Sequence, residues 1–157
     1  MIRFGTSGWR GIIAEDFTFA TVRAVARAIA DHLLSGRGSR VPGPGSIDPE
    51  LATRDSELAV VVGYDTRFLS EAFAAACVRV LAAAGIRSHL VGRPTPTPVL
   101  ALAVRALGAA GAINITASHN PPEWNGLKFS AANGGPALPE VTRAVELFRG
   151  LPTLGQA

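Results

Sequence analysis

The stretch 58–63, Leu-Ala-Val-Val-Val-Gly, is a continuous run of apolar residues. A strand that is apolar along its whole length is buried on both faces, which is typical of a parallel strand covered by helices. Two further strand-like stretches, 86–91 and 112–115, follow it, and apolar residues at helical spacing lie between them. Strands that alternate with helices in this way predict an α/β fold with a mainly parallel sheet.

The helices are expected where apolar residues recur every three or four positions. These segments are 18–34, 70–85, 97–108 and a last helix from Pro139 to about Arg149. Ser70 is expected to be the N-cap of the second helix, and Thr97 the cap of the third with Pro98 at its first position. Glycine follows the second and third helices, as is common at helix ends.

The remaining strands are expected near the two ends of the chain. Residues 2–4 and 12–13 should form a short N-terminal hairpin around the glycine-rich segment 5–11, and 127–130 should form a fourth strand. The predicted fold is a three-layer α/β/α domain with a mainly parallel, roughly four-stranded sheet plus this hairpin. The domain should cover 1–150, with a flexible loop at 35–57 that is rich in Gly, Pro and Ser.

The composition excludes several classes of function. The net charge is +3, but the basic residues are scattered singly, so no nucleic-acid partner is expected. No apolar run approaches the length of a membrane span, and the N-terminus does not resemble a signal peptide, so no membrane partner is expected. The single cysteine, Cys77, should be buried on the apolar face of a helix. A chain with one cysteine forms no internal disulfide, which fits a cytoplasmic location.

Polar residues follow three of the predicted strands at the point where each strand ends. Asp65 and Arg67 follow one strand, Thr95 the next and Ser118 the third. Ligands bind outside the carboxyl ends of the strands in sheets of this kind. These loops should therefore open at one edge and form a site.

The loop that begins at Ser118 is the most unusual part of the chain. It reads Ser-His-Asn-Pro-Pro, and the two prolines cannot belong to a central strand or a helix interior. A rigid loop should therefore expose a hydroxyl, an imidazole and an amide. Taken alone, Ser118 is either a turn residue or a nucleophile, and His119 is either an ordinary loop histidine or a functional one.

Two cationic residues could serve an anionic ligand. Lys128 is the only lysine among fifteen basic residues, and lysine can give up a proton when its surroundings lower its pKa. Arg10 lies in the glycine-rich segment, which is either a phosphate-binding loop or a simple hairpin turn.

Three segments together resemble the first domain of the α-D-phosphohexomutase family, the phosphoglucomutases and phosphomannomutases. They are Phe-Gly-Thr-Ser-Gly-Trp-Arg-Gly at 4–11, Gly-Tyr-Asp-Thr-Arg at 63–67, and Thr-Ala-Ser-His-Asn-Pro at 116–121 with the trailing Asn-Gly-Leu-Lys at 125–128. The resemblance implies an enzyme that interconverts hexose 1-phosphate and hexose 6-phosphate, of glucose or mannose, through a phosphoserine and a bisphosphorylated sugar.

The resemblance also implies roles for particular residues. Ser118 would carry the phosphoryl group, Arg10 would steady it, and Lys128 would move the proton of the sugar hydroxyl. His119 and Asn120 would orient the group or hold the loop. The remaining supporting residues would be Thr6, Ser7, Asp65 and Arg67, the last two bracing the site from behind.

A magnesium ion is implied in the same way. In the family it is shared between the serine phosphate and an Asp-x-Asp-x-Asp loop of a second domain, and this chain contains no Asp-x-Asp pair. The chain is therefore expected to be a first domain alone, inactive by itself, with 151–157 as a truncated linker. Its partners would be hexose phosphate, the hexose 1,6-bisphosphate intermediate and the missing domains. The alternative is a stand-alone, non-catalytic module that binds a sugar phosphate or another protein.

Overall fold

Strands and helices alternate along the chain as the sequence predicts. The computed structural model describes residues 2, 5, 8–36, 58–137, 139, 142 and 143. Its elements are β1 (Trp9–Ile12), α1 (Phe19–Ser35), β2 (Ala59–Tyr64), α2 (Ser70–Ala83), β3 (Arg87–Leu90), α3 (Thr97–Ala106), β4 (Gly111–Ile115) and β5 (Trp124–Ala131). Of the predicted loop at 35–57, only Ser35 and Gly36 are described; most of the last helix and all of 151–157 also lie outside the described residues.

The five strands form one sheet in the order β1-β5-β4-β2-β3. Strand β2 pairs in parallel with both β3 and β4, while β5 runs antiparallel to β4 and to β1. The α/β class and the parallel core are confirmed. Strand β5 has to be antiparallel because the connection from β4 is too short for a crossover.

The N-terminal strand differs from the predicted hairpin. Gly5 and Gly8 close a tight turn through two backbone hydrogen bonds of 3.0 and 3.2 Å. The chain then joins the main sheet as edge strand β1, which begins at Trp9 and not at residue 12. Trp9 is buried and stacks on Phe17 with ring centroids 4.7 Å apart, which explains why this segment pairs with the sheet.

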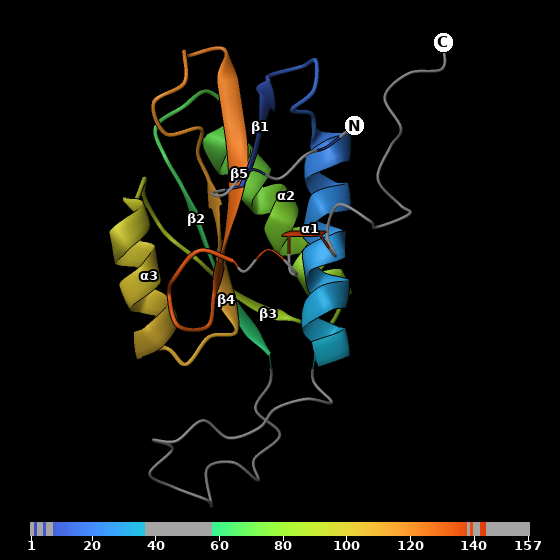
Figure 1. Cartoon of the computed structure of the whole chain (residues 1–157), viewed down its shortest axis with the longest axis vertical. Coiled ribbons are helices and arrows are strands. Elements are labelled where there is room, and N and C mark those ends of the chain that lie inside the picture. Colours follow the sequence, from blue (N-terminus) through green and yellow to red (C-terminus); the bar gives the residue numbers. More distant parts are fainter. Residues whose placement is uncertain are drawn as a thin grey trace, which may run out of the picture.

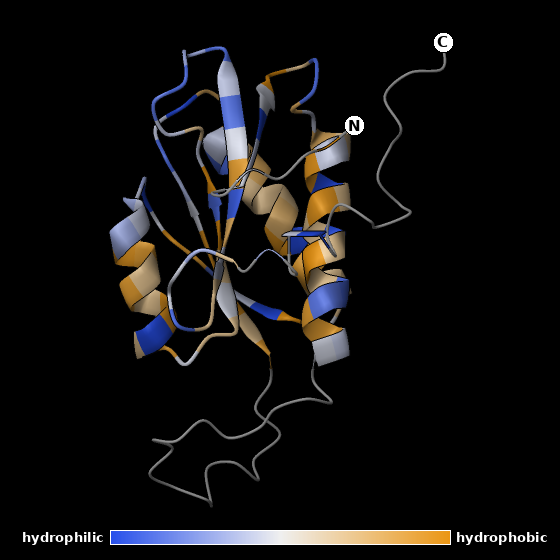
Figure 2. Ribbon diagram, in the orientation of Figure 1, coloured by the Kyte–Doolittle hydropathy of each residue, from blue (hydrophilic) through white to orange (hydrophobic). Residues whose placement is uncertain are grey.

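The helices cover both faces of the sheet, giving three layers (Figure 1). Helices α1 and α2 pack together on one face, and α3 lies on the other. The larger core, built around Phe17, Phe73, Ile113 and Leu127, lies between the sheet and the α1–α2 pair. Helix α2 is apolar along most of its length (Figure 2), and its Cys77 is fully buried, which raises the pKa of the thiol to about 12. No helix in the described part of the chain is both long and apolar enough to cross a membrane.

Two of the predicted helix caps are wrong by one residue. The N-cap of α2 is Leu69, at φ 60°, and the Ser70 hydroxyl donates to Asp65 instead of capping the helix. Helix α3 has Pro96 as its N-cap, and the Thr97 hydroxyl accepts a hydrogen bond from Asn114. In both cases the hydroxyl forms a hydrogen bond with a residue outside the helix instead of capping the helix.

We expect Gly111→Ala to lower the free energy of unfolding by about 2 kcal/mol, the usual cost of overpacking. A Cβ at Gly111 would lie 2.5 Å from the backbone oxygen of Ser130, and neither strand can move without breaking the β4–β5 pairing. Denaturation in guanidinium chloride measures the change. Gly92→Ala is the control because a Cβ there meets nothing within 4 Å. Equal midpoints for the two variants would contradict the packing described for β4.

Candidate active site

Ser118 is presented at the tip of the loop between β4 and β5. The residue is exposed and has φ 59°, the left-handed backbone region that side chains other than Asn and Asp rarely adopt. Its amide donates to Oγ1 of Thr116 at 3.0 Å, and the Asn120 amide donates to the Ala117 carbonyl at 3.2 Å. The loop therefore has a defined conformation with the serine hydroxyl pointing outward from a strained turn.

The Arg67 side chain holds this loop in place. Its guanidinium donates to four backbone carbonyls of the loop and the start of β5. These bonds run from Nη1 to Pro121 (2.8 Å) and Trp124 (3.0 Å), and from Nη2 to Ser118 (3.0 Å) and Asn120 (2.6 Å). The planar, permanently charged guanidinium suits this task, because its donors have a fixed geometry.

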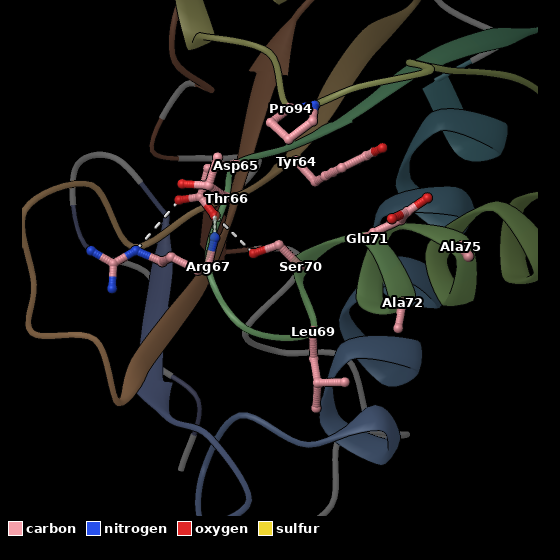
Figure 3. Close-up of a pocket in the computed structure, with 10 residues that line it drawn as sticks. All are labelled: Tyr64, Asp65, Thr66, Arg67, Leu69, Ser70, Glu71, Ala72, Ala75 and Pro94. Atoms are coloured by element: carbon pink, nitrogen blue, oxygen red, sulfur yellow. Dashed lines mark hydrogen bonds and ion pairs between the residues drawn. The ribbon is translucent and has the colours of Figure 1, made fainter.

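Asp65 fixes the arginine in turn. Its Oδ2 lies 3.4 Å from Nε of Arg67, and its Oδ1 accepts from the Arg67 amide at 2.9 Å and from the Ser70 hydroxyl at 2.8 Å. Figure 3 shows Asp65 between these two partners, with Arg67 reaching away from the start of α2. Asp65 and Arg67 thus meet the loop that carries Ser118, at the edge where the sequence predicts the site.

One buried residue that the sequence analysis did not select as a site residue, Asn125, links β5 to the start of α2. Asn125 is fully buried and donates to the Ser70 hydroxyl at 2.9 Å and to the Phe68 carbonyl at 3.3 Å. Its Oδ1 accepts from the Gly126 amide at 2.8 Å. Asn125 stands in the quoted Asn-Gly-Leu-Lys segment, but its burial against α2 is a tertiary fact that the segment alone does not reveal.

Arg10 and Lys128 lie on the same face of the sheet. Their strand neighbours Trp9 and Leu127 point into the core beneath α1 and α2, so Arg10 and Lys128 point toward the face that carries α3. Arg10 pairs with Gly126, and a Cβ on that glycine would lie 3.0 Å from Cγ of Arg10. The absence of a side chain at Gly126 therefore leaves room for the arginine.

The environment of Lys128 lowers the pKa of its ammonium group. Partial burial is the main cause, the nearby charge of Arg10 adds to it, and Asp65 acts in the opposite direction. A lysine whose pKa is below the ordinary value can release a proton more easily and so act as an acid or base.

Most of these groups border one open hollow of about 670 Å³. Its lining residues are Asp65, Thr66, Arg67, Phe68, Thr116, Ser118, Asn120 and Pro122. A second hollow, drawn in Figure 3, shares Asp65, Thr66 and Arg67 and extends along α2 past Glu71 to Ala75.

Arg10, Lys128 and His119 are not among the residues that line this hollow. His119 is exposed, and within the described parts of the chain no hydrogen bond to its ring is found. Thr6 and Ser7 lie outside the described residues.

The described residues offer few ligands for a metal ion. No group of three or more His, Cys, Asp or Glu side chains is present among them. The Asp65 carboxylate is already engaged by Arg67 and Ser70.

The fold and the site define an α/β/α domain that presents an exposed serine on a loop held by an arginine. The chain belongs to the phosphoglucomutase/phosphomannomutase family, because residues 49–148 match its alpha/beta/alpha domain I. The match covers more than half of the chain and includes the loop with Ser118 and the strand with Lys128.

Individual relatives agree with this assignment. The chain is 36% identical to a phosphoglucomutase of Staphylococcus saprophyticus over 94% of its own length and 24% of the relative's. It is 39% identical to a phosphoglucosamine mutase of Frankia casuarinae, over 97% and 31%. The crystal structure of a putative phosphomannomutase from Thermus thermophilus matches with a TM-score of 0.79 and 44% identity, over 96% of this chain and 30% of that one. The chain thus spans about a quarter to a third of the relatives it matches.

We expect Arg67→Lys to loosen the Ser118 loop without unfolding the sheet, because one ammonium group cannot serve four carbonyls. Hydrogen exchange at the Asn120 and Trp124 amides should speed up by about tenfold or more, the equivalent of one lost charged hydrogen bond. Arg27→Lys is the matched control, since Arg27 makes only an exposed ion pair with Asp31 on α1. Unchanged exchange at both loop amides would show that Arg67 does not order the loop.

Proposed function

We propose that this chain is the nucleophile-bearing domain of a cytoplasmic phosphohexomutase that interconverts hexose 1-phosphate and hexose 6-phosphate. Membership of the mutase family supports the reaction class. The observation that carries the proposal is the exposed Ser118 hydroxyl on a strained loop that Arg67 ties down by four hydrogen bonds. A rigidly placed hydroxyl beside cations suits phosphoryl transfer, in which positioning and charge neutralisation do most of the work.

In the proposed cycle Ser118 starts as a phosphoserine. A hydroxyl of the bound hexose phosphate attacks the phosphorus while the deprotonated form of Lys128 accepts its proton, and the bond between phosphorus and Oγ breaks as Lys128 passes this proton on to Oγ. The resulting hexose 1,6-bisphosphate turns over and returns its other phosphoryl group to Ser118 by the reverse proton movements. The lowered pKa of Lys128 suits both directions.

The cationic residues on the sheet face would bind the phosphoryl oxygens. Arg10 can contact them in two-pronged fashion, and His119 and Asn120 on the loop can orient the group. Magnesium would neutralise charge on the transferring group, and among the described residues Ser118 is proposed to hold it through its phosphoryl oxygens. Thr6 and Ser7 are proposed to support the phosphate, as the family resemblance implies.

The sugar is proposed to be glucose or mannose. The family name joins these two, while a relative of similar identity is called a phosphoglucosamine mutase. Trp9 of the glycine-rich segment is buried against Phe17 and so has no access to a sugar. Comparing kcat/KM for the three hexose phosphates in the full-length enzyme tests this choice.

Replacing Ser118 by Ala in the full-length enzyme should reduce turnover to background, because no other hydroxyl occupies the loop tip. The assay couples formation of hexose 6-phosphate to a dehydrogenase, with the bisphosphate activator present. Ser88→Ala on edge strand β3 is the control and should keep the activity within about twofold, as a surface substitution does. Substantial turnover by the Ser118 variant would remove this residue from the nucleophile role.

The 157-residue chain alone should not isomerise hexose phosphate in the presence of magnesium. The chain spans 24% of the phosphoglucomutase relative, and we expect the rest of such a protein to bind the sugar and most of the metal. The same coupled assay, at enzyme concentrations a thousandfold above those used for the complete protein, sets the limit. Clear turnover would show that the described face suffices for catalysis.

A further inference from the structure

Asn114 is a buried polar residue on the face of β4 that carries the site. Only 4% of it is exposed, and its Nδ2 donates to the Thr97 hydroxyl of α3 at 2.8 Å. Its Oδ1 is buried and accepts no hydrogen bond from any residue that the structure describes. A buried acceptor without a donor costs free energy, so this oxygen needs an explanation.

The neighbours of Asn114 on β2 and along β4 donate no hydrogen bond to its Oδ1. On β2 it pairs with Gly63, and the space above that glycine is filled by the Leu100 side chain. Ala112, two residues back on the same face, is apolar. Thr116, two residues ahead, accepts from the Ser118 amide through its Oγ1, and its hydroxyl makes no hydrogen bond to the asparagine oxygen.

The neighbour on the other side is Lys128. Asn114 and Lys128 are direct partners across β4 and β5, and both side chains project toward the α3 face. On the far side of Lys128 lies Gly8, whose Cβ, if present, would come within 2.9 Å of the lysine Cα. The lysine is therefore flanked by Gly8, which has no side chain and directly precedes β1, and by the asparagine on β4.

The orientation of the Asn114 amide agrees with the charge around it. Because Nδ2 donates to Thr97, Oδ1 is the atom of this side chain that can accept a hydrogen bond from the lysine. The reverse orientation would turn N–H donors toward the positive charges of Lys128 and Arg10. An amide oxygen facing an ammonium group is the favourable arrangement.

We propose that Asn114 is a positioning residue: the Lys128 ammonium, which makes no hydrogen bond to it in this structure, turns onto the unpaired Oδ1 and is held there toward the Ser118 loop. Its role as a support for the proton carrier rests on the proposed function; the contact itself does not. Lysine has a long, flexible stem, and a fixed acceptor at the base of the site restricts the positions that its amine can take. Thr97 at the start of α3 fixes the amide, so the helix anchors the lysine indirectly.

The sequence permits a direct test, because Lys128 is the only lysine in the chain. Labelling lysine with ¹³C at Cε gives a single side-chain resonance, and its titration reports the pKa of Lys128. The charged groups that act on it are Arg10 on β1 and Asp65 after β2, and both stay in place in the variants. The measurement needs neither substrate nor activity.

We expect Asn114→Leu, which has nearly the same shape but no acceptor, to lower the pKa of Lys128 by about one unit. This is the effect of removing one hydrogen bond to the charged form. Asn133→Ala, which removes an asparagine from the exposed turn after β5, is the control and should leave the titration unchanged. An unchanged midpoint in a folded Asn114→Leu chain would overturn the proposal.

A second variant keeps the test decisive if Asn114→Leu does not fold. Asn114→Asp retains the oxygen and adds a charge, and it should raise the pKa of Lys128 by about one unit or more. No change in this variant would place the lysine amine away from Asn114 and would contradict the contact.

In the full-length enzyme Asn114→Leu should lower kcat at least tenfold while KM stays within about twofold, because Asn114 acts through Lys128 and not on the substrate. Once Lys128 has been replaced by Gln, the same asparagine substitution should have no further effect on kcat. If the NMR shift is seen but kcat does not change, the contact is right and the role of Lys128 as proton carrier is wrong. An equal, additional loss in the Lys128→Gln background would show a merely structural role.

Discussion

The site depends on the guanidinium group of Arg67. All of its nitrogens are used: Nη1 and Nη2 donate to four carbonyls of the loop and β5, and Nε faces the Asp65 carboxylate. A loop that contains two prolines and a left-handed Ser118 leaves carbonyls that no strand pairing can satisfy. One partly buried arginine supplies these missing partners, and so a strained serine can persist at the edge of the sheet.

The two faces of the sheet have different tasks. Toward α1 and α2, residues such as Trp9, Leu127 and Ile113 form the main core. Toward α3, the alternate positions of the same strands bring Arg10, Lys128 and Asn114 together near the carboxyl edge. The period of two in a β-strand thus lets short strands serve packing and chemistry at once.

Much of the fold could be predicted from the sequence. The buried run of β2 and the helical spacing around it indicate the α/β layers, and the polar residues after β2 and β4 mark the edge where Arg67 meets the Ser118 loop. The short connection from β4 to β5 also indicates that β5 is antiparallel to β4, because a connection between parallel strands needs a dozen residues or more.

The supporting contacts could not be predicted, because they join residues far apart in the sequence. Serine is a residue type that often caps helices, yet the Ser70 hydroxyl accepts a hydrogen bond from Asn125 on β5 and donates one to Asp65. Asn114 stands in an otherwise apolar strand, where the sequence gives no indication of its partner across β5. Such tertiary hydrogen bonds outcompete local preferences and are visible only when the strands are paired.

The measurement that tests the account most directly is phosphopeptide mass spectrometry of the protein isolated from its own cells. The account predicts a phosphoryl group on the tryptic peptide that contains Ser118, lost after incubation with excess hexose phosphate and restored by hexose 1,6-bisphosphate. A Ser118 that is unmodified under all of these conditions would contradict it, and would favour a domain of the same fold that does not carry out phosphoryl transfer.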